Sequence, residues 1–176
     1  MPDAPVPRLG RFQKISYGAG QVAEGIKNNS FEFFLFFYYN QVLGLSGTLG
    51  GAAVAIALVT DAITDPLAGS LSDSTRSRWG RRHPFMYAAP LPLALCFYLV
   101  FNPPAGLGEL GLFAWLCAFA VLTRSAMTLY HVPHMALGAE LSEDYLERTV
   151  IVAYRVFFGL IGVLIASVGG LLLFLP

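Results

Sequence analysis

Charged side chains are scarce in this sequence. Asp, Glu, Lys and Arg account for 12% of the 176 residues, whereas hydrophobic residues account for 56%. A soluble domain carries about a quarter of its residues as charged side chains, so the composition indicates that lipid surrounds most of the chain. The 11 basic and 11 acidic residues balance, which leaves no overall field to attract nucleic acid.

Cysteine is also rare, and the N-terminus lacks an apolar stretch. Cys96 and Cys117 both fall inside apolar runs, where a free cysteine behaves as a small hydrophobic residue, so they indicate neither a disulfide framework nor a metal site. Residues 1–11 are rich in proline and contain no hydrophobic core of a cleavable signal peptide. The sequence shows no nucleophile–base pair and no metal-ligand spacing, so we expect neither an enzyme nor a cofactor.

What the chain has in abundance is long apolar runs. A helix that crosses the hydrocarbon core needs about 20 mostly apolar residues. The predicted membrane-spanning helices follow an N-terminal segment, residues 1–14, and cover residues 15–42, 49–71, 85–101, 110–137 and 150–175. This pattern predicts an all-α polytopic membrane protein. Because the chain ends at Pro176 directly after an apolar run, we expect it to be the front part of a longer protein.

Lys and Arg are distributed unevenly among the connections. Those after the first and third predicted helices contain neither residue, whereas bases gather before the first helix and in the second connection, namely at Arg8, Arg11, Lys14, Arg76, Arg78, Arg81 and Arg82. Cytoplasmic loops carry the excess of Lys and Arg, so the pattern predicts a multi-pass protein of the cytoplasmic membrane with its N-terminus in the cytoplasm. Arg148 is the single base of the fourth connection, which the same alternation places in the cytoplasm.

Two carboxylates stand inside the second predicted helix. Asp61 and Asp65 are four residues apart, so they project from one face, with Thr64 beside them. Two carboxylates close together in a low dielectric do not both stay ionised unless one takes up a proton or a cation binds between them. Their oxygens suit a hard cation such as Na⁺, and ionisable groups inside a membrane indicate function by default. The alternative is a structural pair neutralised by a neighbouring arginine.

The first predicted helix carries a polar set in its middle, which comprises Glu24, Lys27, Asn28, Asn29 and Glu32. Glu24 and Asn28 lie on one face. Such a helix lines a water-filled cavity or packs against polar partners, so Glu24 and Asn28 are candidate substrate contacts and Lys27 is a candidate counter-ion. The alternative is a buried Glu–Lys ion pair that only fixes packing.

Polar residues also recur at helical spacing in the fourth predicted helix. Arg124 is the natural counter-ion for either second-helix carboxylate, and Thr128 can offer an oxygen to the same cation. His131 either faces the substrate or titrates near neutral pH, or it is a plain hydrogen-bonding residue. In the fifth predicted helix, Arg155 either snorkels to the interface or turns inward to hold a substrate oxygen.

The segment Asp61-Ala-Ile-Thr-Asp-Pro-Leu-Ala-Gly-Ser-Leu-Ser-Asp-Ser-Thr-Arg-Ser-Arg-Trp-Gly-Arg-Arg-His-Pro84 closely resembles the signature of the melibiose-permease family. These proteins are the glycoside–pentoside–hexuronide:cation symporters of the major facilitator superfamily. Further segments are similar to the same family, namely Ser16-Tyr17-Gly18, Asn40-x-x-Leu43-Gly44-Leu45, and His131-Val-Pro133 followed by Glu140 and Glu147-Arg148. The resemblance implies the major facilitator fold, with the first five of twelve transmembrane helices present here and the C-terminal half missing. It also implies symport of a sugar or sugar derivative with Na⁺ or H⁺.

The resemblance implies site residues as well. Those matching the family's cation site are Asp61, Thr64, Asp65 and Thr128. Arg155 matches a sugar-contacting arginine. Two sugar-binding acids of the melibiose permease correspond to Gly25 and His131 here, and a stacking tryptophan corresponds to Met135. The likeness therefore carries the cation site over to this chain, but not the galactoside site.

The connection between the second and third predicted helices is similar to the corresponding superfamily loop in Gly69-x-Leu71-x-Asp73 and Gly80-Arg81-Arg82. We expect Asp73 to form a charge lock with the loop arginines, namely Arg76, Arg81 and Arg82. The lock would open as one half of the transporter rocks against the other.

Cation-coupled symport of a small-molecule solute is thus the predicted function, with membrane lipids around the chain and no metal other than the coupling cation. One alternative is a symporter of lysolipid-like molecules on the same fold, since the phenylalanines of the first helix suit a wide apolar cavity. Another is a truncated remnant that does not transport, because five helices cannot supply both halves of an alternating-access carrier.

Overall fold

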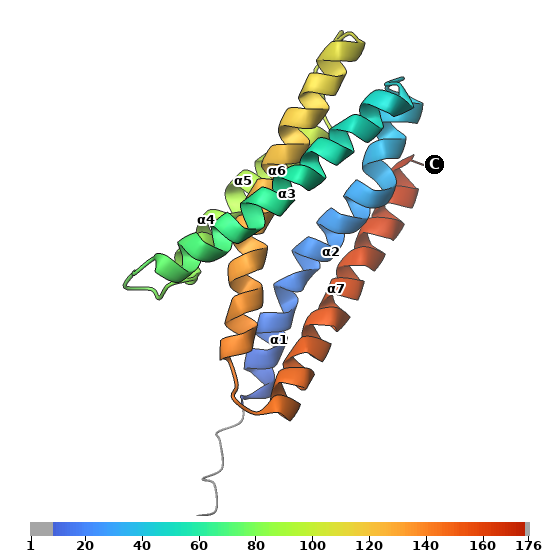
Figure 1. The fold of residues 1–176 in the computed structure, drawn as a ribbon. Helices are drawn as coiled ribbons and strands as arrows, with labels where there is room; N and C mark the ends of the chain where they lie inside the picture. The colour runs from blue at the N-terminus through green and yellow to red at the C-terminus, as the bar shows by residue number, and fades with distance from the viewer. Residues whose placement is uncertain (1–8, 175–176) are drawn as a thin grey trace, which may run out of the picture. The chain divides into compact units, whose positions relative to one another are not determined.

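The computed structural model describes residues 9–174, and the side chains of residues 9–172. All regular elements in this range are helices (Figure 1). The predicted N-terminal segment, residues 1–14, is therefore described only from residue 9, and Arg8 lies outside the described residues. The predicted end of the fifth helix at residue 175 and the chain end at Pro176 lie outside them too.

The α-helices are α1 (Arg11–Ala19), α2 (Gln21–Asn29), α3 (Gly47–Ser74), α4 (His83–Ala88), α5 (Pro90–Val100), α6 (Glu109–Glu140) and α7 (Tyr145–Phe174). Four helical stretches are long and apolar enough to cross a membrane, namely Gly47–Ser74, His83–Val100, Glu109–Glu140 and Tyr145–Leu172. Each begins one to five residues before the span predicted from the apolar pattern. The difference arises because a helix continues through the polar headgroup region, where the apolar pattern has already ended.

The first predicted span, residues 15–42, is helical but broken. After α1 and α2 come two short π-helical segments, η1 (Ser30–Leu35) and η2 (Tyr38–Val42). Charged residues at Glu24, Lys27 and Glu32 reduce its mean hydropathy, so it is not among the four membrane-length apolar stretches. π-Helical turns inside helices often lie at functional sites, and here they follow directly on the polar set of α2.

The chain divides into two compact units. Within the described residues, the first unit comprises residues 9–30 and 134–174, and the second comprises residues 31–133. Both boundaries fall inside helical segments. One lies at the start of η1, and the other follows Pro133 in α6.

In the first unit, α1 and α2 pack along α7 (Figure 1). Glycines allow the backbones to approach closely. A Cβ atom on Gly25 would overlap the carbonyl oxygen of Gly159, and one on Gly162 would overlap the carbonyl oxygen of Val22. Small residues at helix contacts are a common basis of packing in lipid, where no hydrophobic effect drives one helix onto another.

A polar cluster at the start of α7 connects the chain around the start of α1 to the loop before α7. Glu147 is only 4% exposed, and its carboxylate accepts hydrogen bonds from the Leu9 amide at 2.9 Å and the Ser142 hydroxyl at 2.8 Å. The same carboxylate pairs with the Lys14 ammonium at 2.7 Å. These contacts compensate the burial of its charge and attach the beginning of α1 to the loop before α7.

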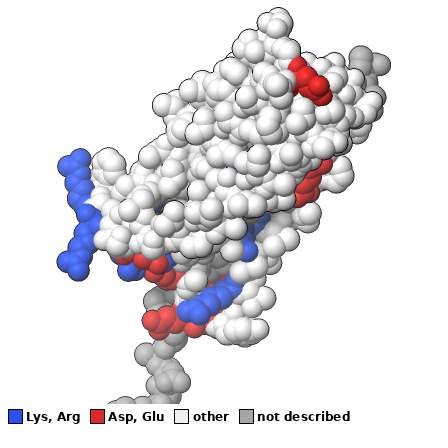
Figure 2. Space-filling view, turned by 45° about the horizontal axis from the view of Figure 1, so that its top comes forward, with Lys and Arg blue, Asp and Glu red and all other residues white. Residues whose placement is uncertain are grey.

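The second unit has an apolar core, which comprises Phe31, Leu35, Tyr39, Leu45, Ala53, Ala57, Val100, Leu112, Leu116 and Ala120. Polar atoms of its aromatic residues find backbone partners. The Tyr39 hydroxyl donates to the Val100 carbonyl at 2.7 Å, and the Trp115 indole N–H donates to the Leu99 carbonyl at 2.8 Å. The surface in view in Figure 2 is mostly uncharged, as expected of helices that face lipid.

Candidate cation-binding site

Two long helices of the second unit, α3 and α6, bring the predicted cation residues together. On α3, Asp61 and Asp65 are one helical turn apart. On α6, Arg124 and Thr128 have the same spacing. Arg124 bonds to Asp61 and Thr128 bonds to Asp65, each across a sequence separation of 63 residues. The equal separation means that the two helices run in the same direction at this point, with two successive turns in register.

The contact between Thr128 and Asp65 joins a hydroxyl to a carboxylate. Thr128 Oγ1 donates a hydrogen bond to Asp65 Oδ1 at 2.7 Å. Thr128 is buried at 7% exposure, whereas Asp65 is exposed. A hydroxyl that donates its proton to a carboxylate keeps its oxygen lone pairs for a further partner. The pair therefore presents carboxylate and hydroxyl oxygens from two helices to one place.

The contact between Arg124 and Asp61 is an ion pair on a single carboxylate oxygen. Asp61 Oδ2 accepts from Arg124 Nε at 2.6 Å and lies 2.5 Å from Arg124 Nη2. The side chains are 22% and 17% exposed respectively. The sequence left open whether the arginine pairs with Asp61 or Asp65, and in the structure it pairs with Asp61.

Two oxygens of the site are buried without hydrogen bonds. Within the described residues, neither Asp61 Oδ1 nor Thr64 Oγ1 has a hydrogen-bond partner. Buried polar atoms in folded proteins are rarely left unpaired, so these two oxygens are suited to a ligand. Pro66 follows Asp65 and has no N–H, so position 66 cannot donate the usual helical bond to the Ala62 carbonyl. The Ala62 carbonyl oxygen, which is near the carboxylates in the sequence, therefore lacks its usual helical N–H donor.

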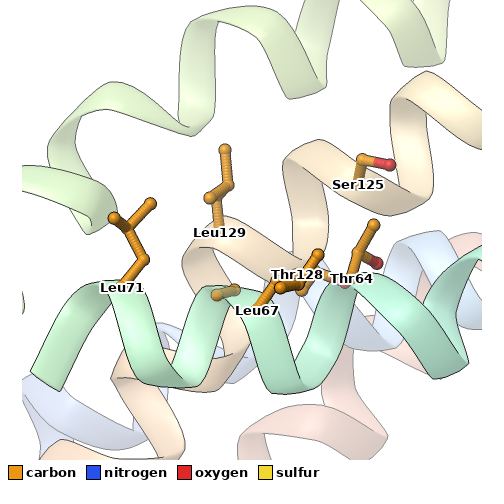
Figure 3. A pocket seen from close by; sticks show the side chains of 7 residues that line it. Thr64, Leu67, Leu71, Ser125, Thr128 and Leu129 are labelled. Carbon is orange, nitrogen blue, oxygen red and sulfur yellow. The ribbon is translucent and has the colours of Figure 1, made fainter.

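A pocket of about 200 Å³ opens beside these residues. Figure 3 shows its lining side chains, with Leu71 and Leu129 toward one end and Thr64 and Ser125 toward the other. Thr128 and Leu67 lie between them. The wall of the pocket is almost entirely apolar, because Thr64 Oγ1 is buried and Thr128 Oγ1 is bonded to Asp65.

The formal charges of the site do not cancel. Two aspartates and one arginine sum to a single negative charge, provided that both carboxylates are ionised. One monovalent cation would neutralise this charge. Carboxylate and hydroxyl oxygens fit a hard cation such as Na⁺, and a proton on either carboxylate would have the same effect on the total.

Comparison with known proteins identifies the family of the chain. The sequence matches the family described as MFS/sugar transport protein over residues 16–176, where MFS denotes the major facilitator superfamily. The chain belongs to this family. The match confirms the resemblance predicted from the sequence and the predicted fold class, an all-α, polytopic portion of a major facilitator transporter. The family contains membrane transporters rather than enzymes.

The relatives of the chain include symporters whose names state different solutes. An uncharacterized symporter of Synechocystis sp. is 36% identical over 160 residues, which cover 88% of this chain and 29% of the relative. The putative glycoside/cation symporter YagG of Escherichia coli is 32% identical over 88% of this chain and 33% of the relative. The sodium-dependent lysophosphatidylcholine symporter 1-A of Danio rerio is 27% identical over 89% of this chain and 29% of the relative. The chain thus spans about a third of the length of these relatives.

In this transporter portion, the charge lock expected at the end of α3 has one contact. Arg82 Nη2 lies 3.2 Å from Asp73 Oδ1, and Arg82 is buried at 8% exposure. Arg76 and Arg81 are exposed, and the ion pair of Asp73 goes to Arg82.

The candidate substrate residues of α2 form a small network in the first unit. The Glu24 carboxylate accepts hydrogen bonds from the Gln21 amide, one turn earlier, and from the Asn28 amide at 3.4 Å, one turn later. Lys27 is buried at 8% exposure. Gly25 packs against the backbone of α7. The polar face of α2 therefore contains Glu24 and not Gly25.

The remaining substrate candidates lie in different units. Arg155 belongs to the first unit, where its guanidinium contacts the sulfur of Met135. His131 belongs to the second unit and is half-buried. Glu24, Asn28 and Arg155 therefore belong to the first unit, and His131 belongs to the second unit with the cation residues.

Sequence reasoning missed a paired aromatic contact in the first unit. Tyr17 and His134 stack with ring centroids 4.4 Å apart. The Tyr17 hydroxyl donates to the His134 carbonyl at 3.1 Å, and His134 Nε2 lies 2.9 Å from the Tyr17 carbonyl oxygen. The two residues are 117 positions apart, so no local spacing could indicate the contact. Gln21, by contrast, was detectable, because it lies one turn before Glu24.

Proposed function

We propose that the protein is part of a secondary transporter that couples a monovalent cation, Na⁺ or H⁺, to solute symport across the cytoplasmic membrane. The ligands of the cation are Asp61, Asp65, Thr64 and Thr128, and Arg124 is the fixed counter-ion. The observation that carries the proposal is the α3–α6 contact. In this contact, the Asp65 carboxylate accepts a hydrogen bond from the Thr128 hydroxyl, and the Asp61 carboxylate pairs with Arg124. Asp61 Oδ1 and Thr64 Oγ1 have no hydrogen-bond partner within the described residues. The formal charges of the two carboxylates and the arginine sum to −1.

The solute in this proposal is a sugar or sugar derivative. Support comes from the family description and from the glycoside/cation relative of Escherichia coli. Glu24 and Asn28 supply carboxylate and amide groups of the kind that bind sugar hydroxyls. Arg155 and His131 are further candidate contacts, and the second half of the transporter would complete the solute pathway.

A second candidate solute is a lysolipid-like molecule. Two observations favour it, namely the lysophosphatidylcholine relative of Danio rerio and the leucines that line most of the pocket beside the cation residues. An apolar wall suits an acyl chain better than a sugar ring.

Uptake measurements on the full-length transporter test the cation proposal. Asp65→Asn should abolish cation-dependent uptake and leave the amount of inserted protein unchanged. Asp144→Asn makes the same chemical change at the residue before α7, where Asn caps a helix as well as Asp does, and should leave uptake unchanged. An Asp65→Asn variant that keeps its Na⁺ or pH dependence would contradict the proposal. Radiolabelled sugars and lysolipids, supplied under separate Na⁺ and pH gradients, distinguish the solutes and the cations.

A further inference from the structure

The loop between α3 and α4 carries exposed arginines and aromatic rings on one surface. We call this surface the interfacial patch, and its members are Arg76, Arg78 and Trp79 of the loop with Tyr87 of α4. Trp79 is 56% exposed and Tyr87 is 68% exposed. Figure 2 shows basic side chains projecting at the left edge of a surface that is otherwise mostly uncharged.

The interfacial patch lies where two membrane-length helices end. The stretch Gly47–Ser74 precedes the loop, and the stretch His83–Val100 follows it. A short loop between two spanning helices lies at the boundary between hydrocarbon and water, at the depth of lipid headgroups. Trp and Tyr are enriched at that depth, because one part of each ring system is apolar and the other is polar.

Hydrogen bonds hold the loop in a defined turn. The Gly80 amide donates to the Ser77 carbonyl at 3.0 Å, and the Trp79 amide donates to the Ser77 hydroxyl at 3.2 Å. Gly80 has a φ of +92°, which a residue with a Cβ atom adopts only with strain. The turn sets the Arg78 guanidinium 5.1 Å from the centroid of the Trp79 ring, and this ring packs edge-on against Tyr87 at 6.3 Å.

In the part of the chain that the structure describes, no acidic side chain neutralises Arg76 or Arg78 of the interfacial patch. Asp73 is the acid at this end of α3, and it pairs with the buried Arg82 at 3.2 Å. Within the described residues, neither Arg76 nor Arg78 forms an ion pair. The patch therefore offers guanidinium groups to an anion. None of its members carries a carboxylate for the ammonium group of a zwitterionic lipid, and the nearby Asp73 is already paired with Arg82.

We propose that the interfacial patch binds the headgroup of an anionic phospholipid from the surrounding membrane. The guanidinium groups of Arg76 and Arg78 hold the phosphate oxygens, since arginine pairs with phosphate through two parallel hydrogen bonds. The rings of Trp79 and Tyr87 pack against the glycerol region below the phosphate. This site is independent of the transported solute and of the cation site.

Fluorescence of Trp79 tests the proposal directly. Residues 1–176 contain two tryptophans, so Trp115→Phe, together with Phe at any tryptophan in the remainder of the full-length transporter, leaves Trp79 as the only one. This variant of the full chain is placed in bilayers in which either phosphatidylglycerol or phosphatidylcholine carries brominated acyl chains that quench a nearby indole. Quenching at equal mole fraction should show a several-fold preference for phosphatidylglycerol. Each exposed arginine near an anionic membrane surface corresponds to about a fivefold change in affinity, so Arg78→Gln should lower the preference about fivefold.

Removing an arginine elsewhere on the protein distinguishes a lipid-binding site from a general effect of the surface potential. Arg11→Gln removes one exposed arginine at the start of α1, and it should leave the lipid preference at Trp79 unchanged. An equal loss in Arg11→Gln and Arg78→Gln would overturn the site, as would equal quenching by both lipids in the parent. Salt provides a test without an arginine substitution, because added salt should reduce the preference. A preference that does not change with salt would also overturn the proposal.

Discussion

The hydrogen bond between Thr128 and Asp65 yields the sharpest test of the cation site. Thr128→Ala removes a donor that lies 2.7 Å from Asp65 Oδ1, and it removes a candidate cation ligand at the same time. The substitution also replaces a largely buried side chain, at 7% exposure, with a smaller one. We therefore expect cation binding to weaken while the helix itself remains intact.

The expected magnitude follows from the character of the bond. A hydrogen bond to a charged group contributes about 1.5–3 kcal/mol. Because the carboxylate of Asp65 is exposed, water competes for it, and the lower end of this range applies. About 1.5 kcal/mol corresponds to about a tenfold change in affinity. With Na⁺ as the coupling cation, its half-saturating concentration should rise about tenfold.

Two neighbouring substitutions serve as controls. Thr128→Ser keeps the hydroxyl and should restore most of the cation affinity. Ser125→Ala removes a hydroxyl one turn earlier on α6 that lines the same pocket, and it should leave the affinity within about twofold, since surface-type substitutions without a lost partner have small effects.

The assay is Na⁺-dependent uptake by the full-length transporter in membrane vesicles, with solute concentration held constant and Na⁺ varied. Half-saturating Na⁺ concentrations are compared at equal amounts of inserted protein. The reasoning would be refuted if Thr128→Ala and Ser125→Ala had equal effects, because loss of side-chain volume at the pocket rather than loss of the bond would then explain both. A Thr128→Ser variant as impaired as Thr128→Ala would refute it as well.

Two further predictions concern the gate and the packing of the first unit. Asp73→Asn should slow solute uptake more than it weakens cation binding, because it breaks the 3.2 Å pair with Arg82 and leaves the cation residues in place; equal losses in uptake rate and binding would count against a gating role. Gly162→Ala should lower the free energy of unfolding by about 1–3 kcal/mol, the usual cost of overpacking, because its Cβ would overlap the Val22 carbonyl. Gly169→Ala, at a position with no atom of a neighbour within 4 Å, should change that free energy by less than about 1 kcal/mol; reversible unfolding in mixed micelles compares the two glycines.

The helical spacing of polar and charged residues was sufficient to predict most residues of the candidate cation site. An i, i+4 pair of acids on α3 and an i, i+4 pair of arginine and threonine on α6 are both visible in the sequence. The spacing could not choose which acid takes the arginine. That choice depends on the register between two helices whose bonded residues are 63 positions apart. The two helices pack closely in the same register at Gly69, where a Cβ would lie 3.6 Å from Val132 Cγ1, and the spacing within either helix does not encode this packing.

The first span shows where an apolar pattern gives less information. A run of 28 residues, 15–42, was long enough to predict one helix. The structure has four helical pieces there, because the polar residues and crowded aromatics make the local hydrogen-bond pattern depend on tertiary partners. Tyr39 is one example, since its hydroxyl bonds to the Val100 carbonyl 61 residues away.

The charge count of the site also gives a physical reason for coupling in the proposed mechanism. Asp61, Asp65 and Arg124 sum to −1, and moving a net charge through a low-dielectric interior is costly. A bound Na⁺ or proton brings the sum to zero, so the loaded site changes conformation more readily than the empty one. α3 continues from Asp65 to Asp73, which are about 12 Å apart at 1.5 Å per residue. The helix that carries the proposed cation ligands thus also carries Asp73, the acid of the expected charge lock, and with Arg124 present one monovalent cation would suffice for neutrality.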